Sequence, residues 1–249
     1  MLRLDETDRL RLATQRMVGH LLAPLWIFAA ALVLRFVCGY RIDGRAEARA
    51  RYRALRAGNR LPLLLCANHL TLVDSVLIAW ALGSPAWYLW RFSALPWNVP
   101  ERRNFASSWW SRALVYVLKC LPITRGGDRR EISGVLSRVS YLLETGEVVL
   151  IFPEAGRSRT GRIDVDAAAW GVGRIVGSVP GCRVLCVYLR GERQSQFSDL
   201  PARGQRFRVE LALLEPKSDL RGLRRSMDLS RQILTKLAEM EQRWLDGQG

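Results

Sequence analysis

Short apolar runs alternate with amphipathic stretches along the chain after residue 40. The apolar runs predict strands at 61–67, 86–92, 147–152, 183–190 and 206–214. The stretches between them predict helices at 73–83, 105–119, 129–144, 166–178 and 219–245. Continuous apolar strands separated by helices are typical of a sheet that is buried on both faces. We therefore expect an α/β fold with a mixed, largely parallel sheet covered by helices.

The N-terminal part differs from the rest, because residues 21–34 form one continuous apolar run. Fourteen helical residues span about 21 Å, which is shorter than the roughly 30 Å hydrocarbon layer of a bilayer. Arginines flank the run on both sides, so charge does not predict a crossing. We expect a helical segment, kinked near Pro24, that enters one leaflet and returns. A buried core helix and a single span are the alternatives.

This pattern divides the chain into an N-terminal membrane-docking helical segment, residues 1–40, and one larger domain, residues 41–249. Lys and Arg number 38 against 23 Asp and Glu, a formal charge of +15. Such an excess favours an anionic partner: nucleic acid, acidic lipid or a phosphorylated substrate. No nucleic-acid-binding signature occurs, and the apolar run has no role in such binding, so we expect no nucleic-acid partner.

The cysteines and tryptophans add two further expectations. Five cysteines are scattered without a C-x-x-C pair, which predicts reduced thiols facing the cytosol and no zinc site. Six of the nine tryptophans fall between residues 80 and 110. Trp rings favour the membrane–water interface, but they also fill cores, and the sequence leaves both interpretations open.

The sharpest chemical signal is the segment Asn68–Asp74, where an apolar strand ends and a helix begins. A carboxylate in the first helical turn, at Asp74, can reach the Nδ1–H group of His69 at the strand end. It would fix the imidazole tautomer and leave Nε2 as a general base. The alternative is that Asp74 only caps the helix and His69 is an ordinary loop residue.

A second polar motif, Phe152–Arg159, follows the predicted strand 147–152. Arg157 and Arg159 can hold a phosphate, and Glu154 can orient them or bind a hydroxyl of an acceptor. Arg125 follows another short apolar run and adds a third basic position. The alternative interpretation of each arginine is a solvated basic loop.

N-H-x-x-x-x-D, followed about eighty residues later by F-P-E-x-x-R-S, resembles the glycerolipid acyltransferase family, which includes the lysophosphatidic acid acyltransferases. The resemblance covers about residues 40–215. It implies transfer of a fatty acyl group from acyl-CoA or acyl carrier protein to the hydroxyl of a lyso-lipid. We expect 1-acylglycerol-3-phosphate as the acceptor, in phospholipid biosynthesis, with no cofactor or metal.

By this resemblance, His69 is the general base and Asp74 its orienting partner. The substrate-binding residues that it implies are Arg125, Glu154, Gly156, Arg157 and Ser158. No serine or cysteine nucleophile is needed, because a thioester is already activated. The expected location is the cytoplasmic face of the inner membrane, bound to anionic lipid through residues 1–40.

The acceptor-side motifs depart from the family pattern. Ala155 and Gly156 stand where the family has Gly and Thr, and Lys119 and Pro122 where it has Gly and Phe. The apolar stretch 184–187 lacks the usual proline. Another lyso-lipid, such as an acylated amino acid or a glycolipid, is therefore an alternative acceptor. Hydrolysis of acyl-CoA and non-enzymatic membrane binding are the remaining alternatives.

Overall fold

The computed structural model describes residues 4–58, 61–102, 108–124, 126–154, 156–158 and 160–247. Its centre is a six-stranded sheet with the order β1-β6-β5-β2-β4-β3. The strands are β1 (Arg41–Asp43), β2 (Leu63–Ala67), β3 (Trp97–Asn98), β4 (Val148–Ile151), β5 (Arg183–Gly191) and β6 (Arg206–Leu214). Only β5 and β6 pair antiparallel, and every other neighbouring pair is parallel. The predicted mixed, largely parallel α/β fold is confirmed.

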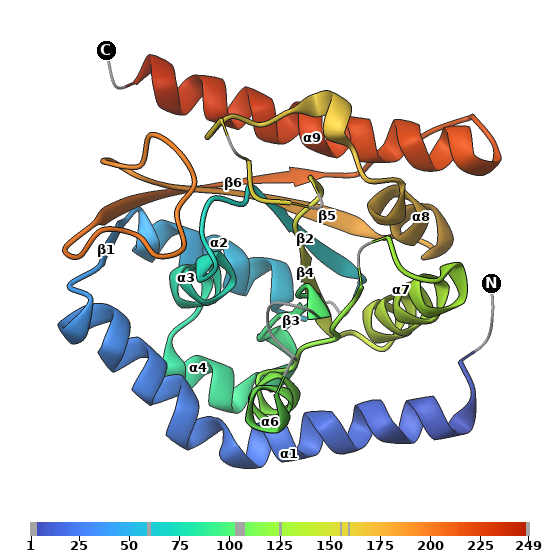
Figure 1. Cartoon of the computed structure of the whole chain (residues 1–249), viewed down its shortest axis with the longest axis horizontal. Coiled ribbons are helices and arrows are strands. Elements are labelled where there is room, and N and C mark those ends of the chain that lie inside the picture. Colours follow the sequence, from blue (N-terminus) through green and yellow to red (C-terminus); the bar gives the residue numbers. More distant parts are fainter. Residues whose placement is uncertain are drawn as a thin grey trace.

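Helices cover both faces of this sheet (Figure 1). The described α-helices are α1 (Glu6–Leu32), α2 (Arg45–Arg56), α3 (Asp74–Leu82), α4 (Pro85–Trp90), α6 (Trp109–Val117), α7 (Arg129–Glu144), α8 (Trp170–Ser178) and α9 (Gly222–Asp246). A π-helical turn, η1 (Val33–Val37), extends α1, and short 3-10 turns lie at η2 (Phe92–Ala94) and η3 (Val165–Ala167). Figure 1 shows α9 along one side of the molecule and α1 along the opposite side.

The alternating side chains of β2 divide the interior into two cores. Leu63 and Leu65 belong to a core shared with α1, α2, α3 and α4. Leu64 and Cys66 belong to a second core shared with α7, α8 and α9. A central strand buried on both faces explains why 61–67 is an unbroken apolar run in the sequence.

The predicted strand 86–92 is wrong, because this segment forms the helix α4. The Ser84 hydroxyl accepts the Trp87 N–H at 3.3 Å, and Pro85 occupies the first helical turn. An N-cap followed by proline favours a helix strongly enough to outweigh the strand preference of the aromatic residues that follow. The short strands β1 and β3 and the helix α2 were not predicted.

The N-terminal apolar run lies within α1 and η1, and the helix continues past Pro24. The expected return within the run is therefore wrong, because α1 bends along its course but does not reverse (Figure 1). Proline removes one N–H donor and kinks a helix, but flanking hydrogen bonds keep it continuous. The division of the chain at residue 40 stays a prediction.

Candidate active site

The two polar motifs leave the same edge of the sheet. Register pairs Cys66 of β2 with Ile151 of β4 in parallel, so the loops that follow these strands begin side by side. The Ser158 N–H donates to the His69 carbonyl at 3.0 Å and joins the two loops directly. Polar loops at the carboxyl ends of parallel strands are the usual place for an α/β active site.

His69 and Asp74 are in contact. The imidazole Nδ1 lies 3.0 Å from Oδ2 of Asp74, which is buried at the start of α3. The same oxygen accepts the N–H groups of Leu70 at 2.6 Å and Thr71 at 2.7 Å. The Thr71 hydroxyl donates to the other carboxylate oxygen. Asp74 therefore both contacts the imidazole and holds the loop that carries it. The alternative of a helix cap is wrong, because Val73 is the N-cap residue of α3 and no side chain caps it.

The imidazole of His69 is held on its face as well. Its ring stacks on Phe152, with centroids 4.0 Å apart and planes at 14°. Next to it, the Asn68 side chain bonds the Leu189 N–H and carbonyl, each at 2.9 Å, and ties β2 to β5. Within the described part of the chain, no protein group hydrogen-bonds Nε2. The geometry leaves that nitrogen available for proton transfer.

Glu154 follows β4 and lies beside the backbone of His69. Burial raises the pKa of this carboxyl to about 7, and hydrogen bonds from the backbone at His69 and Asp164 only partly oppose the shift. Its Oε1 atom is buried and has no hydrogen-bond partner among the described residues. A buried, unpartnered carboxyl oxygen is costly, and an acceptor hydroxyl would satisfy it.

Arg157 is already paired. Its Nη1 donates to Oδ1 of Asp199 at 2.7 Å and to the Ser198 carbonyl at 3.1 Å. The guanidinium also lies over the Phe197 ring, at 5.4 Å. The sequence analysis missed this 197–199 segment, which carries no motif and no hydrophobic period.

Segment 197–199 also binds the loop that carries His69. The Ser198 N–H donates to the Leu70 carbonyl at 3.0 Å, and the Leu72 N–H donates to the Asp199 carbonyl at 3.1 Å. The side chain of Arg157 is therefore linked to the histidine loop through this segment.

The other predicted binding residues have different positions. The Ser158 hydroxyl donates to the Arg162 carbonyl, so it shapes its own loop. Gly156 lies in the same loop, between Glu154 and Arg157. Arg125 and Arg159 lie outside the described residues.

Arg190, at the end of β5, is a buried cation that the sequence analysis did not single out. Its Nη1 donates to the Gly161 carbonyl at 2.7 Å and pairs with Glu241 of α9 at 3.2 Å. Its other nitrogens donate to the carbonyls of Gln194 and Ser195 at 2.9 and 3.2 Å. Arg190 thus fixes the loops that carry Ser158 and Asp199. The sequence signal that could have found Arg190 is an arginine at the end of a largely apolar strand.

Within the described ranges, no group of three or more His, Cys, Asp or Glu side chains forms a metal site. No curated protein matches the sequence with significant similarity. A family model described as Acyltransferase matches residues 48–190, more than half of the chain, and this range contains both polar motifs. The chain therefore belongs to the acyltransferase family, that of the glycerolipid acyltransferases.

Proposed function

We propose that this protein transfers a fatty acyl group from acyl-CoA or acyl carrier protein to the hydroxyl of a lysophospholipid. The acceptor that we expect is 1-acylglycerol-3-phosphate, which gives phosphatidic acid. The observation that carries the proposal is the 3.0 Å contact between His69 and Asp74 inside an acyltransferase domain.

In the proposed mechanism, Asp74 accepts the Nδ1–H of His69 and leaves Nε2 unprotonated. Nε2 takes the proton of the acceptor hydroxyl while that oxygen attacks the thioester carbonyl carbon. The tetrahedral intermediate collapses, the C–S bond breaks, and the leaving thiolate recovers the proton from the imidazolium. A positioned base of this kind contributes about 10²–10⁴ in rate.

The acceptor's phosphate would bind the loop after β4. Arg157 would exchange its contact with Asp199 for the phosphate, with Gly156 and Ser158 in the same loop. The resemblance adds Arg125 as a further binding residue. Glu154 would accept a hydroxyl at its unpartnered oxygen. The Arg157–Asp199 pair supports this exchange because the Asp199 side chain is largely exposed and free to move away.

The same pair favours a second candidate acceptor, an acylated amino acid lipid. Its carboxylate would contact Arg157 while a free side-chain amine would contact Asp199, so both partners of the existing ion pair would be used. A headgroup with only negative charge would use one of them and be repelled by the other.

We further propose that residues 1–40 hold the domain on an anionic membrane, at its cytoplasmic face. The helix from Glu6 to Val37 has a mean hydropathy of 2.1 in its most apolar part, and only 22% of that window is buried in the fold. Apolar burial in lipid would not be weakened by salt, whereas attraction of the flanking arginines would be.

The test combines the purified full chain with acyl-CoA and a panel of lyso-lipids, and identifies the product by mass while free thiol is followed. Acceptor-dependent thiol release with an acylated product supports the proposal. Thiol release without acceptor indicates a hydrolase, and no release with any acyl-CoA or acyl carrier protein donor indicates a non-enzymatic protein. Either result would overturn it.

A further inference from the structure

The six tryptophans between residues 80 and 110 differ in burial. Trp80 and Trp97 are buried in the two cores, and the partly buried Trp87 packs against one of them. Trp90, Trp109 and Trp110 are 87%, 79% and 60% exposed. The core interpretation therefore holds for the buried rings, and three large apolar side chains are left exposed.

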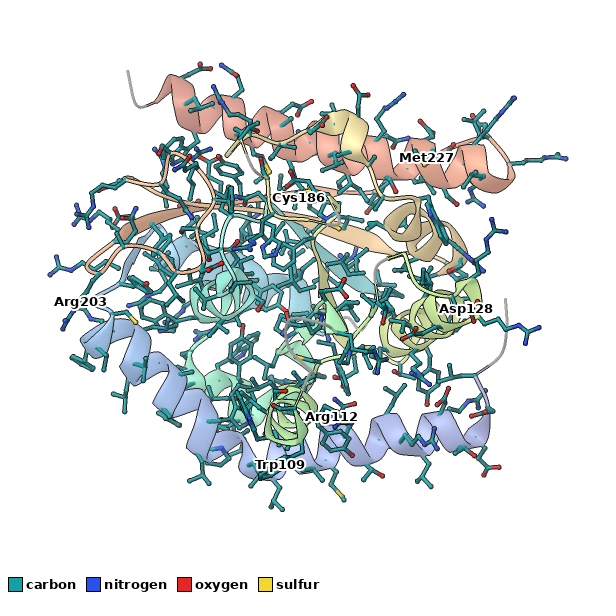
Figure 2. All side chains as sticks on the ribbon, viewed as in Figure 1. Trp109, Arg112, Asp128, Cys186, Arg203 and Met227 are labelled. Carbon is teal, nitrogen blue, oxygen red and sulfur yellow. The ribbon has the colours of Figure 1, made fainter. Side chains whose placement is uncertain are left out.

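The exposed rings lie on the helices that pack against α1. His20 of α1 contacts the carbonyl of Leu89, next to Trp90, at 3.0 Å. Gln15 of α1 donates to the carbonyl of Tyr116 in α6 at 3.0 Å. Figure 1 shows α4, α6 and α1 on the side of the molecule away from α9, and Figure 2 shows Trp109 there.

The outward face of α1 is apolar along the same side. Exposed apolar side chains recur every three to four residues along α1 and η1, at Leu21, Leu25, Phe28, Leu32 and Phe36. Its inward face is buried against the domain at Leu12, Gln15, Gly19, Ala23 and Ile27. One helix thus offers the fold one face and leaves the other uncovered.

From these positions we propose that Trp90 of α4 and Trp109 and Trp110 of α6 join the outer face of α1 in one docking surface for a phospholipid bilayer. The inference goes beyond the proposed reaction and beyond residues 1–40. The occupant is lipid because indole rings prefer the bilayer interface, where the ring is apolar and its N–H is wet. Exposed Arg91 and Arg112 adjoin the rings and match acidic headgroups.

Contacts between α1 and the rest of the domain favour an orientation of α1 in the plane of the membrane. At its start, Asp8 pairs with Arg138 of α7 at 2.9 Å, and Arg16 pairs with Glu147 at 2.9 Å. Beyond its end, Leu34 of η1 belongs to the core. A crossing α1 would lose these contacts and carry Gln15 and Arg16 toward hydrocarbon. A helix lying in the interface keeps them.

The test is sedimentation of the full chain with vesicles of phosphatidylcholine and phosphatidylglycerol in high salt, which screens the arginines. We expect the W90A/W109A/W110A variant to have a partition constant lower on the order of a hundredfold. Even partial burial of one ring in lipid raises the partition constant about fivefold, and three rings multiply this effect. A matched control, W170A/L223A/M227A, removes exposed apolar side chains from α8 and α9, where Figure 2 shows Met227. It should stay within about threefold of the parent.

The proposal would be overturned if W90A/W109A/W110A bound vesicles as the parent does, or if the control lost as much binding. All three rings are exposed, so we expect the variant to fold, and circular dichroism and Tm check this. A second readout compares fluorescence quenching of parent and variant by lipids brominated near the headgroup or near the chain end. We expect the fluorescence that the variant has lost to be quenched mainly by bromine near the headgroup. No quenching, or stronger quenching by bromine near the chain end, would contradict rings that lie in the interface. Sedimentation needs no turnover, so this result is independent of the proposed reaction.

Discussion

The Oδ2 atom of Asp74 lies 3.0 Å from Nδ1 of His69 and also accepts the backbone N–H groups of Leu70 and Thr71. One carboxylate therefore sets both the orientation of the imidazole and the shape of the loop that carries it. Loss of the charge should affect the chemistry and the fold at once.

We expect Asp74→Asn to lower kcat by about two to four orders of magnitude, because an amide no longer holds the required tautomer. The free energy of unfolding should fall by about 1–3 kcal/mol, because the amide satisfies fewer of the loop donors. Steady-state kinetics and urea unfolding measure the two effects. A folded variant with near-normal kcat would show that Asp74 only holds the loop.

Arg157→Ala should raise the acceptor KM by about one to two orders of magnitude for a phosphate-bearing acceptor, and the donor KM much less. A charge-assisted contact of this kind contributes about 1.5–3 kcal/mol. Asp199→Asn should lower the KM for 1-acylglycerol-3-phosphate, because it removes the competing anion. Equal changes in both KM values for the Arg157 variant would instead place this arginine at the donor.

Glu154 should make the protein less stable as pH rises. Its pKa in the fold is raised to about 7 from an ordinary 4.5, so its contribution favours folding below pH 4.5 and is lost as pH rises through 7. The full difference is roughly 3 kcal/mol. Glu154→Gln should flatten the fall in unfolding free energy between pH 5 and pH 8. An unchanged slope would contradict this assignment.

The buried pair between Lys119 and Glu147 joins α1 to the domain. Lys119 Nζ lies 2.8 Å from Glu147, whose other oxygen pairs with Arg16 of α1. Burial lowers the pKa of Lys119 to about 8. Glu147→Ala leaves a buried cation unpaired and should lower the unfolding free energy by about 3–5 kcal/mol.

Glu144→Ala, at an exposed position three residues earlier, is the control for that change and should stay within about 0.5 kcal/mol. The double variant K119M/E147L should recover most of the loss, because it removes both buried charges. A Glu147 variant as stable as the parent would mean that water already reaches Lys119.

Sequence patterns predicted the parts of the fold that depend on local periodicity. The helix 129–144 and the strand 206–214 match their observed bounds. The strand predicted at 86–92 failed because aromatic residues favour strands, whereas a cap and a proline here begin a helix. Strands of two or three residues, such as β1 and β3, hold too few positions to show a period.

The candidate site shows the same limit. His69 and Asp74 could be paired from the sequence because they are close along the chain and belong to one loop and helix start. Asp199 and Arg190 contact Arg157 and Gly161, which lie 42 and 29 residues away in sequence. The parallel pairing of β2 with both β4 and β5 brings these segments near. The division of the tryptophans into buried and exposed rings likewise depends on which of them face the two cores.

The most direct test of the proposed reaction compares His69→Ala with His20→Ala, which removes the other histidine of the chain. His20 lies on α1 against Phe92 and the Leu89 carbonyl. Thiol release and product mass are followed with detergent-dispersed acceptor and acyl donor, after circular dichroism has shown both variants folded. The account predicts a loss of at least about a hundredfold in kcat for the His69 variant and near-parent turnover for the His20 variant. Near-parent turnover without His69 would contradict it.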